Sequence, residues 1–250
     1  MRRSTLAELE PGDLEVEVEH LTLKGVDGSL VDAIHARPDG LPRCGLVLHP
    51  DIMGLRPLYD DLCRRLATHG FAVCAPEPFA RAPVELLAEA TARMGYIKDL
   101  DDDLQLADLE VAADYLVVHD DVTEVVVMGF CMGGMQVLKA AATGRFDRAV
   151  SFYGMIRTPA DWRGPKLREP LDTAADVCPT LAIFGGIDSY TPEADIDALR
   201  SAWTNRRDCE IVVYPDADHG FVHVPERPTH RAADAADAWR RTLAFLMPSA

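Results

Sequence analysis

Two patterns of apolar and polar positions divide the chain. Residues 14–24 alternate apolar with acidic or polar side chains, which is typical of a strand with one face on a core. The turn Gly25-Val26-Asp27-Gly28 and a second strand over residues 29–36 complete an antiparallel hairpin. The later strands are short and almost wholly apolar, which indicates burial on both faces of a parallel sheet. We expect them at residues 45–48, 71–75, 125–128, 149–153, 180–184 and 210–214.

Amphipathic segments separate these strands. They predict helices over residues 58–69, 84–97, 104–118, 132–142, 192–205 and 231–246. This alternation predicts an α/β fold with a mostly parallel central sheet and helices on both faces. We assign residues 14–250 to this single domain and residues 1–13 to a mobile N-terminal segment. Residues 157–177 contain several prolines without periodicity, so we expect a long loop near the functional site.

Composition restricts the possible partners. A formal net charge of -16 opposes binding to nucleic acid or to an anionic membrane surface. No stretch reaches the roughly 18 consecutive apolar residues of a membrane-spanning helix, and no apolar signal core follows the first residues. The six cysteines include no C-x-x-C motif, which favours reduced thiols. We therefore expect a cytoplasmic protein that is a monomer or a small homo-oligomer.

The strongest chemical motif is Gly129-Phe130-Cys131-Met132-Gly133-Gly134, between a predicted strand and a predicted helix. In the nucleophile elbow G-x-S-x-G, small residues flank the reactive side chain because the strained turn leaves no room for a Cβ atom. Cys131 stands where serine would. The helix that begins at Met132 would direct its first amides at the sulfur, which favours a thiolate. A dinucleotide-binding turn fits less well, because G-x-G-x-x-G requires glycine at Cys131.

A thiol nucleophile needs a base, and the base needs an orienting acid. His219 follows the strand expected at residues 210–214, and Asp188 follows the strand expected at residues 180–184. The order nucleophile, acid, histidine is that of α/β-hydrolases. We therefore predict a catalytic triad of Cys131, Asp188 and His219. Asp218 is the rival acid, although an adjacent side chain cannot easily turn back onto the imidazole.

These motifs resemble the dienelactone hydrolase (carboxymethylenebutenolidase-like) family of α/β-hydrolases, whose nucleophile is a cysteine in a G-x-C-x-G-G elbow. The resemblance covers about residues 14–246 and includes His49-Pro50-Asp51-Ile52-Met53-Gly54. It implies the α/β-hydrolase fold and an oxyanion hole formed by the backbone amides of Ile52 and Met132. It also implies an acid close to the resting cysteine. Asp51 stands there in place of a longer glutamate, so its role is either thiol control or loop capping.

The resemblance also suggests where substrate binds. Family members hold the carboxylate of a lactone with arginines, one of them four residues after the catalytic histidine, where this chain has His223. Arg227, Arg81 and Arg56 lie in loops that could reach the pocket, and we take Arg81, His223 and Arg227 as candidate substrate contacts.

The expected function is hydrolysis of a small ester or lactone through an acyl-thioester, without a metal or an organic cofactor. Three alternatives stay open. The first is a thioesterase or broad carboxylesterase with the same triad, and the second is a catalytically silent scaffold that binds a small molecule. The third is redox sensing by Cys131.

Overall fold

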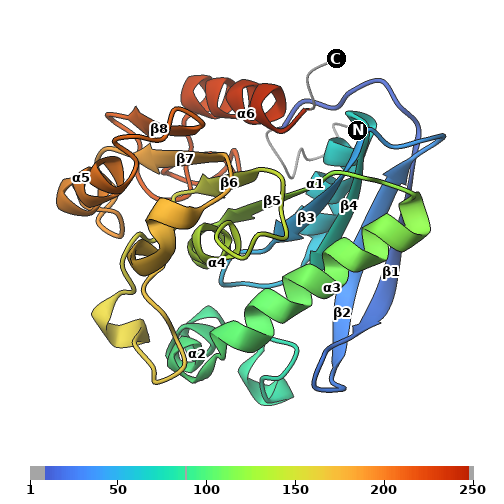
Figure 1. The fold of residues 1–250 in the computed structure, drawn as a ribbon, viewed down its shortest axis with the longest axis horizontal. Coiled ribbons are helices and arrows are strands. Elements are labelled where there is room, and N and C mark those ends of the chain that lie inside the picture. Colours follow the sequence, from blue (N-terminus) through green and yellow to red (C-terminus); the bar gives the residue numbers. More distant parts are fainter. Residues whose placement is uncertain (1–8, 88, 248–250) are drawn as a thin grey trace.

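A mixed eight-stranded sheet forms the centre of the molecule, with helices on both of its faces (Figure 1). The computed structural model describes residues 9–87 and 89–247. The strands are β1 (Val16–Lys24), β2 (Leu30–Pro38), β3 (Cys44–His49), β4 (Phe71–Pro76), β5 (Val125–Phe130), β6 (Ala149–Phe152), β7 (Thr180–Gly185) and β8 (Cys209–Tyr214). Their order in the sheet is β1-β2-β4-β3-β5-β6-β7-β8.

The pairing of the strands follows the two apolar patterns. β1 pairs with β2 and β2 pairs with β4 in antiparallel fashion, whereas the strands from β4 to β8 run parallel to one another. Every residue of β3, β4, β5, β6 and β7 is buried, while β1 alternates exposed and partly buried positions. The predicted N-terminal hairpin and the mostly parallel sheet are therefore confirmed.

The helices pack on the two faces of the sheet in two groups. Their bounds are α1 (Pro57–Thr68), α2 (Ala90–Tyr96), α3 (Asp102–Asp120), α4 (Met132–Ala140), α5 (Glu193–Ala202) and α6 (Ala232–Leu246). α1 and α6 share an apolar cluster with Leu46 and Met128. α3, α4 and α5 share another with Val47 and Val127, the neighbours of those residues in the same strands. Side chains that alternate along each strand thus fill both cores.

One predicted helix is wrong in its extent. In place of a helix over residues 84–97, the chain forms the short 3₁₀ turn η1 (Val84–Leu86), then α2, then the 3₁₀ turn η2 (Ile97–Asp99), and residue 88 lies outside the described residues. The Leu87 carbonyl accepts a hydrogen bond from the Arg93 side chain. This side-chain bond joins the residue after η1 to α2 across the break in the predicted helix. The expected loop at residues 157–177 likewise contains the 3₁₀ turns η3 (Ala160–Trp162) and η4 (Pro170–Asp176).

The described part of the expected mobile segment contacts α1. Leu9 is buried in the cluster of α1 and α6, and its carbonyl accepts a hydrogen bond of 2.8 Å from Arg65. The Gly12 amide donates to the Thr68 hydroxyl at 2.7 Å. Residues 1–8 of that segment lie outside the described residues. Burial of one apolar side chain is the physical reason that residues 9–13 follow α1.

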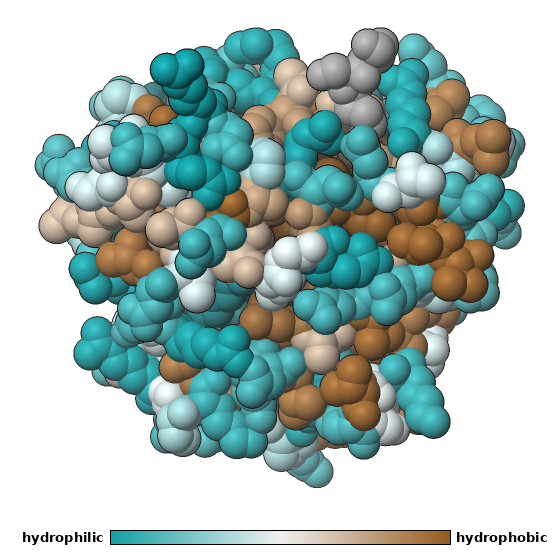
Figure 2. Space-filling view, viewed as in Figure 1, coloured by the Kyte–Doolittle hydropathy of each residue, from teal (hydrophilic) through white to brown (hydrophobic). Residues whose placement is uncertain are grey.

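Polar side chains cover much of the face of the molecule in Figure 2, with patches of apolar side chains between them. Over residues 9–87 and 89–247, no helix is long and apolar enough to cross a membrane.

A buried ion pair joins α3 to α4, the helix that follows the elbow. The Asp102 carboxylate accepts hydrogen bonds from Lys139 at 2.8 and 3.0 Å, from Gln136 at 2.9 Å and from the Arg168 amide at 2.6 Å. The side chains of Asp102 and Lys139 are 0% and 3% exposed. Removing one partner of such a pair leaves an uncompensated charge in the interior.

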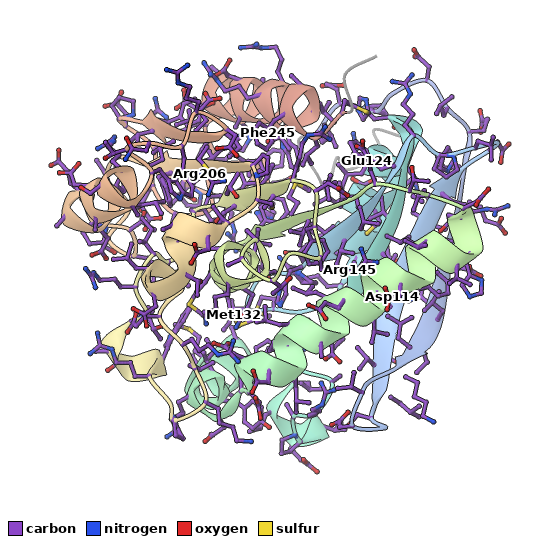
Figure 3. The ribbon with its side chains drawn as sticks, in the orientation of Figure 1. Asp114, Glu124, Met132, Arg145, Arg206 and Phe245 are labelled. Carbon is purple, nitrogen blue, oxygen red and sulfur yellow. The ribbon has the colours of Figure 1, made fainter. Side chains whose placement is uncertain are left out.

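We expect Asp102→Ala to lower the free energy of unfolding by about 3–5 kcal/mol, because Lys139 stays buried without a counter-charge. The double variant Asp102→Ala/Lys139→Met should lose less. The matched control is Asp114→Ala, which breaks the exposed pair with Arg145 labelled in Figure 3 and should cost no more than about 1 kcal/mol. Urea denaturation measures all three. Equal losses for Asp102→Ala and Asp114→Ala would contradict the assignment.

Candidate active site

The carboxyl ends of the parallel strands bring four loops together. His49 at the end of β3 lies opposite Gly129 in β5, and Gly185 at the end of β7 lies opposite Tyr214 in β8. Ligands bind at this edge of parallel sheets because the loops that follow the strands converge there. A cavity of about 80 Å³ lies between these loops; its lining residues are Asp51, Ile52, Met53, Cys131, Tyr153, His219, Gly220, His223 and Arg227.

Cys131 has a strained backbone at the tip of the turn between β5 and α4. Its φ and ψ are 56° and -121°, a conformation that L-residues rarely adopt, and it occupies the N-cap of α4. Its amide donates to the Phe152 carbonyl at 3.0 Å, which fixes the turn against β6. Met132 begins α4, where Figure 3 labels it. The first amides of a helix have no partner within the helix, so they are available to a group near the sulfur.

Glycines make this turn possible. A Cβ atom on Gly129 would lie 2.5 Å from the Gly133 carbonyl oxygen. One on Gly133 would lie 2.4 Å from the carbonyl oxygens of His49 and Pro50. Only glycine at this position therefore lets α4 pack so close to the end of β3. One on Gly134 would lie 2.7 Å from the Phe152 carbonyl oxygen. The elbow therefore has the close backbone packing that its glycines predict.

The structure brings the other two predicted triad residues together. The His219 Nδ1–H donates to Asp188 Oδ2 at 2.7 Å, and Asp188 is buried. The other oxygen, Oδ1, accepts from the Tyr190 amide at 2.8 Å, which orients the carboxylate. Asp218, the rival acid, instead accepts from the backbone amide of His219 at 2.7 Å. Asp188 is therefore the acid that meets the ring.

The remaining ring nitrogen, His219 Nε2, is buried and has no hydrogen bond within normal limits to any described residue. Burial lowers the pKa of His219, but the interactions with Asp188 and Cys131 outweigh it and raise the pKa to about 10. A protonated imidazole at neutral pH favours a negative charge on its neighbour. The arrangement suits an imidazolium at His219 that Asp188 stabilises.

Ile52 lies in the tight turn of residues 51–54 that follows β3. Ile52 and Met132 share an apolar cluster with Trp162, against which Cys131 also packs. Ile52 lines the cavity, whereas Met132 begins α4 directly after Cys131 and is not among the lining residues. The role of their backbone amides as donors to an oxyanion stays a prediction.

The Asp51 carboxylate forms an ion pair with Arg56. Arg56 donates to both oxygens of the Asp51 carboxylate at 2.7 Å, and the Met53 amide donates to Oδ1 at 2.9 Å. Burial raises the pKa of Asp51, but Arg56 outweighs burial and holds it below its usual range. These contacts cap the loop, and they pair the Arg56 guanidinium with Asp51. The sequence did not reveal this pair, because no periodic pattern relates two residues in the same irregular loop.

The three candidate substrate contacts differ in their position and in their charge. Arg81 does not line the cavity: Asp27 and Asp108 bind its guanidinium through four hydrogen bonds of 2.6–3.0 Å. His223 lines the cavity, but burial lowers its pKa to about 3, so its ring is neutral. Arg227 also lines the cavity and forms no ion pair with the described residues. Its guanidinium therefore remains available to an anionic group.

The sequence reasoning missed Tyr153. Its backbone φ is 38°, its hydroxyl forms a hydrogen bond with His223 Nδ1, and its ring meets the His219 ring edge-on at 4.9 Å between centroids. Tyr153 directly follows β6, beside the strand that leads to the elbow. Its place at a strand's carboxyl end was the available signal.

A mostly parallel sheet, a nucleophile elbow after β5, and an acid and a histidine after β7 and β8 define an α/β-hydrolase. A model of the dienelactone hydrolase family matches residues 31–249. The chain belongs to the dienelactone hydrolase family, and the resemblance found in its motifs is confirmed.

Individual relatives cover most of the chain. A protein of Escherichia coli (strain K12), named "Putative carboxymethylenebutenolidase", is 34% identical over 225 residues, which span 86% of this chain and 82% of the relative. The carboxymethylenebutenolidase of Rhodococcus opacus is 28% identical over 237 residues, with 94% and 92% covered. The crystal structure of a "Putative Dienelactone Hydrolase" from Klebsiella pneumoniae subsp. pneumoniae MGH 78578 has a TM-score of 0.83 and 29% identity, with 92% and 98% covered.

We expect Asp188→Asn to lower the pKa of His219 by at least about one unit, because an amide does not stabilise the imidazolium. In the wild type the folded pKa lies above the unfolded value, so the stabilisation from this pair is present in full below about pH 6.5 and is lost as pH rises towards 10. NMR titration of the ring protons measures the shift. Asp218→Asn is the matched control, since that carboxylate meets only the backbone amide. Equal shifts in both variants would refute Asp188 as the orienting acid.

Proposed function

We propose that this protein hydrolyses a small carboxylic ester or lactone, with Cys131 as the nucleophile. The observation that carries the proposal is the strained Cys131 at the N-terminus of α4, beside the imidazole of the His219–Asp188 pair. Family membership supports the reaction class, since relatives bear the name carboxymethylenebutenolidase. The thiol in place of serine and the raised pKa of His219 support attack by a thiolate.

The mechanism moves one proton between sulfur, imidazole and leaving group. His219 holds the proton from the Cys131 thiol while the thiolate attacks the carbonyl carbon and a C–S bond forms. The amides of Ile52 and Met132 donate to the oxyanion. When the C–O bond breaks, the leaving oxygen takes the proton from His219. Water then attacks the acyl-thioester as His219 accepts its proton, and the sulfur leaves as the thiolate.

The cavity suggests a small substrate with an anionic end. Its volume is about 80 Å³, and Arg227 is one of its lining residues. Arginine binds a carboxylate through two parallel hydrogen bonds. The apolar cluster with Ile52 and Trp162 lies on the Cys131 side. We propose that Arg227 holds a carboxylate while the reacting carbonyl lies over the sulfur.

A broad carboxylesterase is the second candidate. His223 is neutral at the position where family members with known lactone binding have an arginine, so one cationic contact is absent there. A site with one available arginine depends less on a negative charge of the substrate than a site with two. A neutral ester therefore loses less binding free energy in it.

We also propose that the enzyme works in a reducing compartment such as the cytoplasm, as a monomer or a small homo-oligomer. All six cysteines are free thiols, and the proposed nucleophile must stay reduced to react.

We expect Cys131→Ala to lower kcat/KM for both a dienelactone and a p-nitrophenyl ester by about three orders of magnitude or more, because it removes the attacking atom. Steady-state hydrolysis measures the loss. Cys209→Ala, which changes a partly exposed thiol at the opposite end of the sheet, serves as the control and should keep wild-type rates. A kcat/KM of Cys131→Ala close to that of the wild type would contradict the proposal.

We expect Arg227→Gln to raise KM about tenfold for an ester that bears a carboxylate and to leave KM for a neutral ester of the same size unchanged. Arg81→Gln is the matched control, because that guanidinium is bound by Asp27 and Asp108 away from the cavity. An equal rise in KM for both esters in Arg227→Gln would show that Arg227 does not bind the carboxylate of the substrate.

A further inference from the structure

A second carboxylate, from outside the loop of residues 51–55, binds an amide of that loop. Glu77 directly follows β4, and its side chain is 13% exposed. Its Oε2 accepts from the Leu55 amide at 2.8 Å, and its Oε1 accepts from the Phe79 amide at 3.0 Å. Arg93 in α2 donates to the same Oε1 at 3.3 Å. One carboxylate thus joins the loop after β3 to the loop after β4 and to α2.

Arg93 is itself fixed by its surroundings. It is buried, its Nε–H donates to the Leu87 carbonyl at 2.9 Å, and its guanidinium carbon lies 5.1 Å from the centre of the Phe79 ring. A guanidinium held by a carbonyl, a carboxylate and an aromatic face has little freedom to move. Glu77 therefore has a rigid counter-charge.

The loop is in direct contact with this ion pair. Gly54 has a φ of +63°, and a Cβ atom there would lie 2.4 Å from Arg93 Nη1 and 2.5 Å from Glu77 Oε1. Only glycine tolerates both the left-handed backbone and the close approach. The ion pair and the backbone of the loop are therefore packed closely at Gly54.

The hydrogen bonds of this loop single out one amide. Four of the five amides from residue 51 to residue 55 have named acceptors: Tyr59 Oη for Asp51, Asp51 Oδ1 for Met53, the Asp51 carbonyl for Gly54, and Glu77 Oε2 for Leu55. Ile52 has the remaining amide, which is the donor assigned to the oxyanion. The loop is held on both sides of Ile52, by Asp51 on one side and by Glu77 on the other.

We propose that Glu77, held by Arg93, is a positioning residue for the oxyanion hole: it fixes the loop so that the Ile52 amide points to the oxygen that becomes negative. The inference rests on the proposed thiol-dependent hydrolysis. Glu77 touches neither substrate nor sulfur, and it acts through the loop. Donors aimed in advance at a developing charge contribute more than donors that must reorganise.

Glu77→Gln is the sharpest probe, because glutamine keeps the size of the side chain, removes the charge that Arg93 needs, and turns an NH₂ group towards one of the two amides. We expect the rate of Cys131 acylation by p-nitrophenyl acetate to fall about 10- to 100-fold, somewhat less than the effect of removing an oxyanion donor outright.

Alkylation of Cys131 by iodoacetamide provides the readout that separates positioning from general damage. In that reaction the thiolate displaces iodide from an sp³ carbon, a C–S bond forms as the C–I bond breaks, and no oxyanion develops. We expect Glu77→Gln to alkylate at Cys131 within about twofold of the wild-type rate, measured on the Cys131 peptide by mass spectrometry, since the thiolate and His219 are unchanged.

Two further variants complete the design. Asp147→Asn changes a carboxylate that accepts the Val125 amide at the other end of the sheet, and both of its rates should match the wild type. Arg93→Lys keeps the positive charge but loses the planar contacts, so its acylation should be slowed less than that of Glu77→Gln, with normal alkylation. Arg93→Lys carries the test if Glu77→Gln does not fold.

The outcomes separate this inference from the proposed function. Slow acylation with normal alkylation supports it. Unchanged acylation in both Glu77→Gln and Arg93→Lys overturns it, and so does an equal fall of acylation and alkylation. If the wild type acylates at a site other than Cys131, the proposed function has failed, and that result appears before any variant at Glu77 is compared.

Discussion

The left-handed backbone of Cys131 is the constraint on which the rest of the site depends. This conformation places Cys131 at the N-cap of α4, next to the first amides of that helix. It persists because α4 packs backbone to backbone against the ends of β3 and β6, at distances that leave no space for side chains on Gly133 and Gly134. The packing of α4 against the sheet thus offsets the conformational energy of the strained backbone. The cavity adjoins this turn, and the triad and oxyanion donors that we propose are defined relative to it.

Buried and partly buried carboxylates organise the loops around that turn, each by a different set of partners. Asp188 binds the His219 ring, and Asp51 caps the loop after β3 with the help of Arg56. Glu77, which follows β4, binds the Leu55 amide of the same loop and is paired with Arg93 of α2. Each has a partner that offsets the cost of its burial. Arg227, by contrast, faces the cavity with no carboxylate partner among the described residues. An acidic protein can therefore still offer a local site for an anion.

Much of this arrangement could be predicted from the sequence, since it depends on local patterns. Alternation in residues 14–24 and the apolar strands specified the sheet, and the glycines around Cys131 specified the elbow. The places of Asp188 and His219 after strands brought the pair together correctly. Long-range polar contacts could not be predicted in the same way. Asp27 and Asp108 bind the Arg81 guanidinium although both are far from it in sequence. Glu77 and Arg93, which are 16 residues apart, form an ion pair that no periodic pattern predicts.

The most direct test of the account is to trap the acyl-enzyme. The protein would be mixed with p-nitrophenyl acetate, quenched in acid within the first turnover and digested, and its peptides analysed by mass spectrometry. The account predicts one acetyl group on the peptide that contains Cys131, released by hydroxylamine as expected for a thioester. An acetyl group on another residue, or hydrolysis with no acylated peptide and full turnover after Cys131 is alkylated, would contradict it.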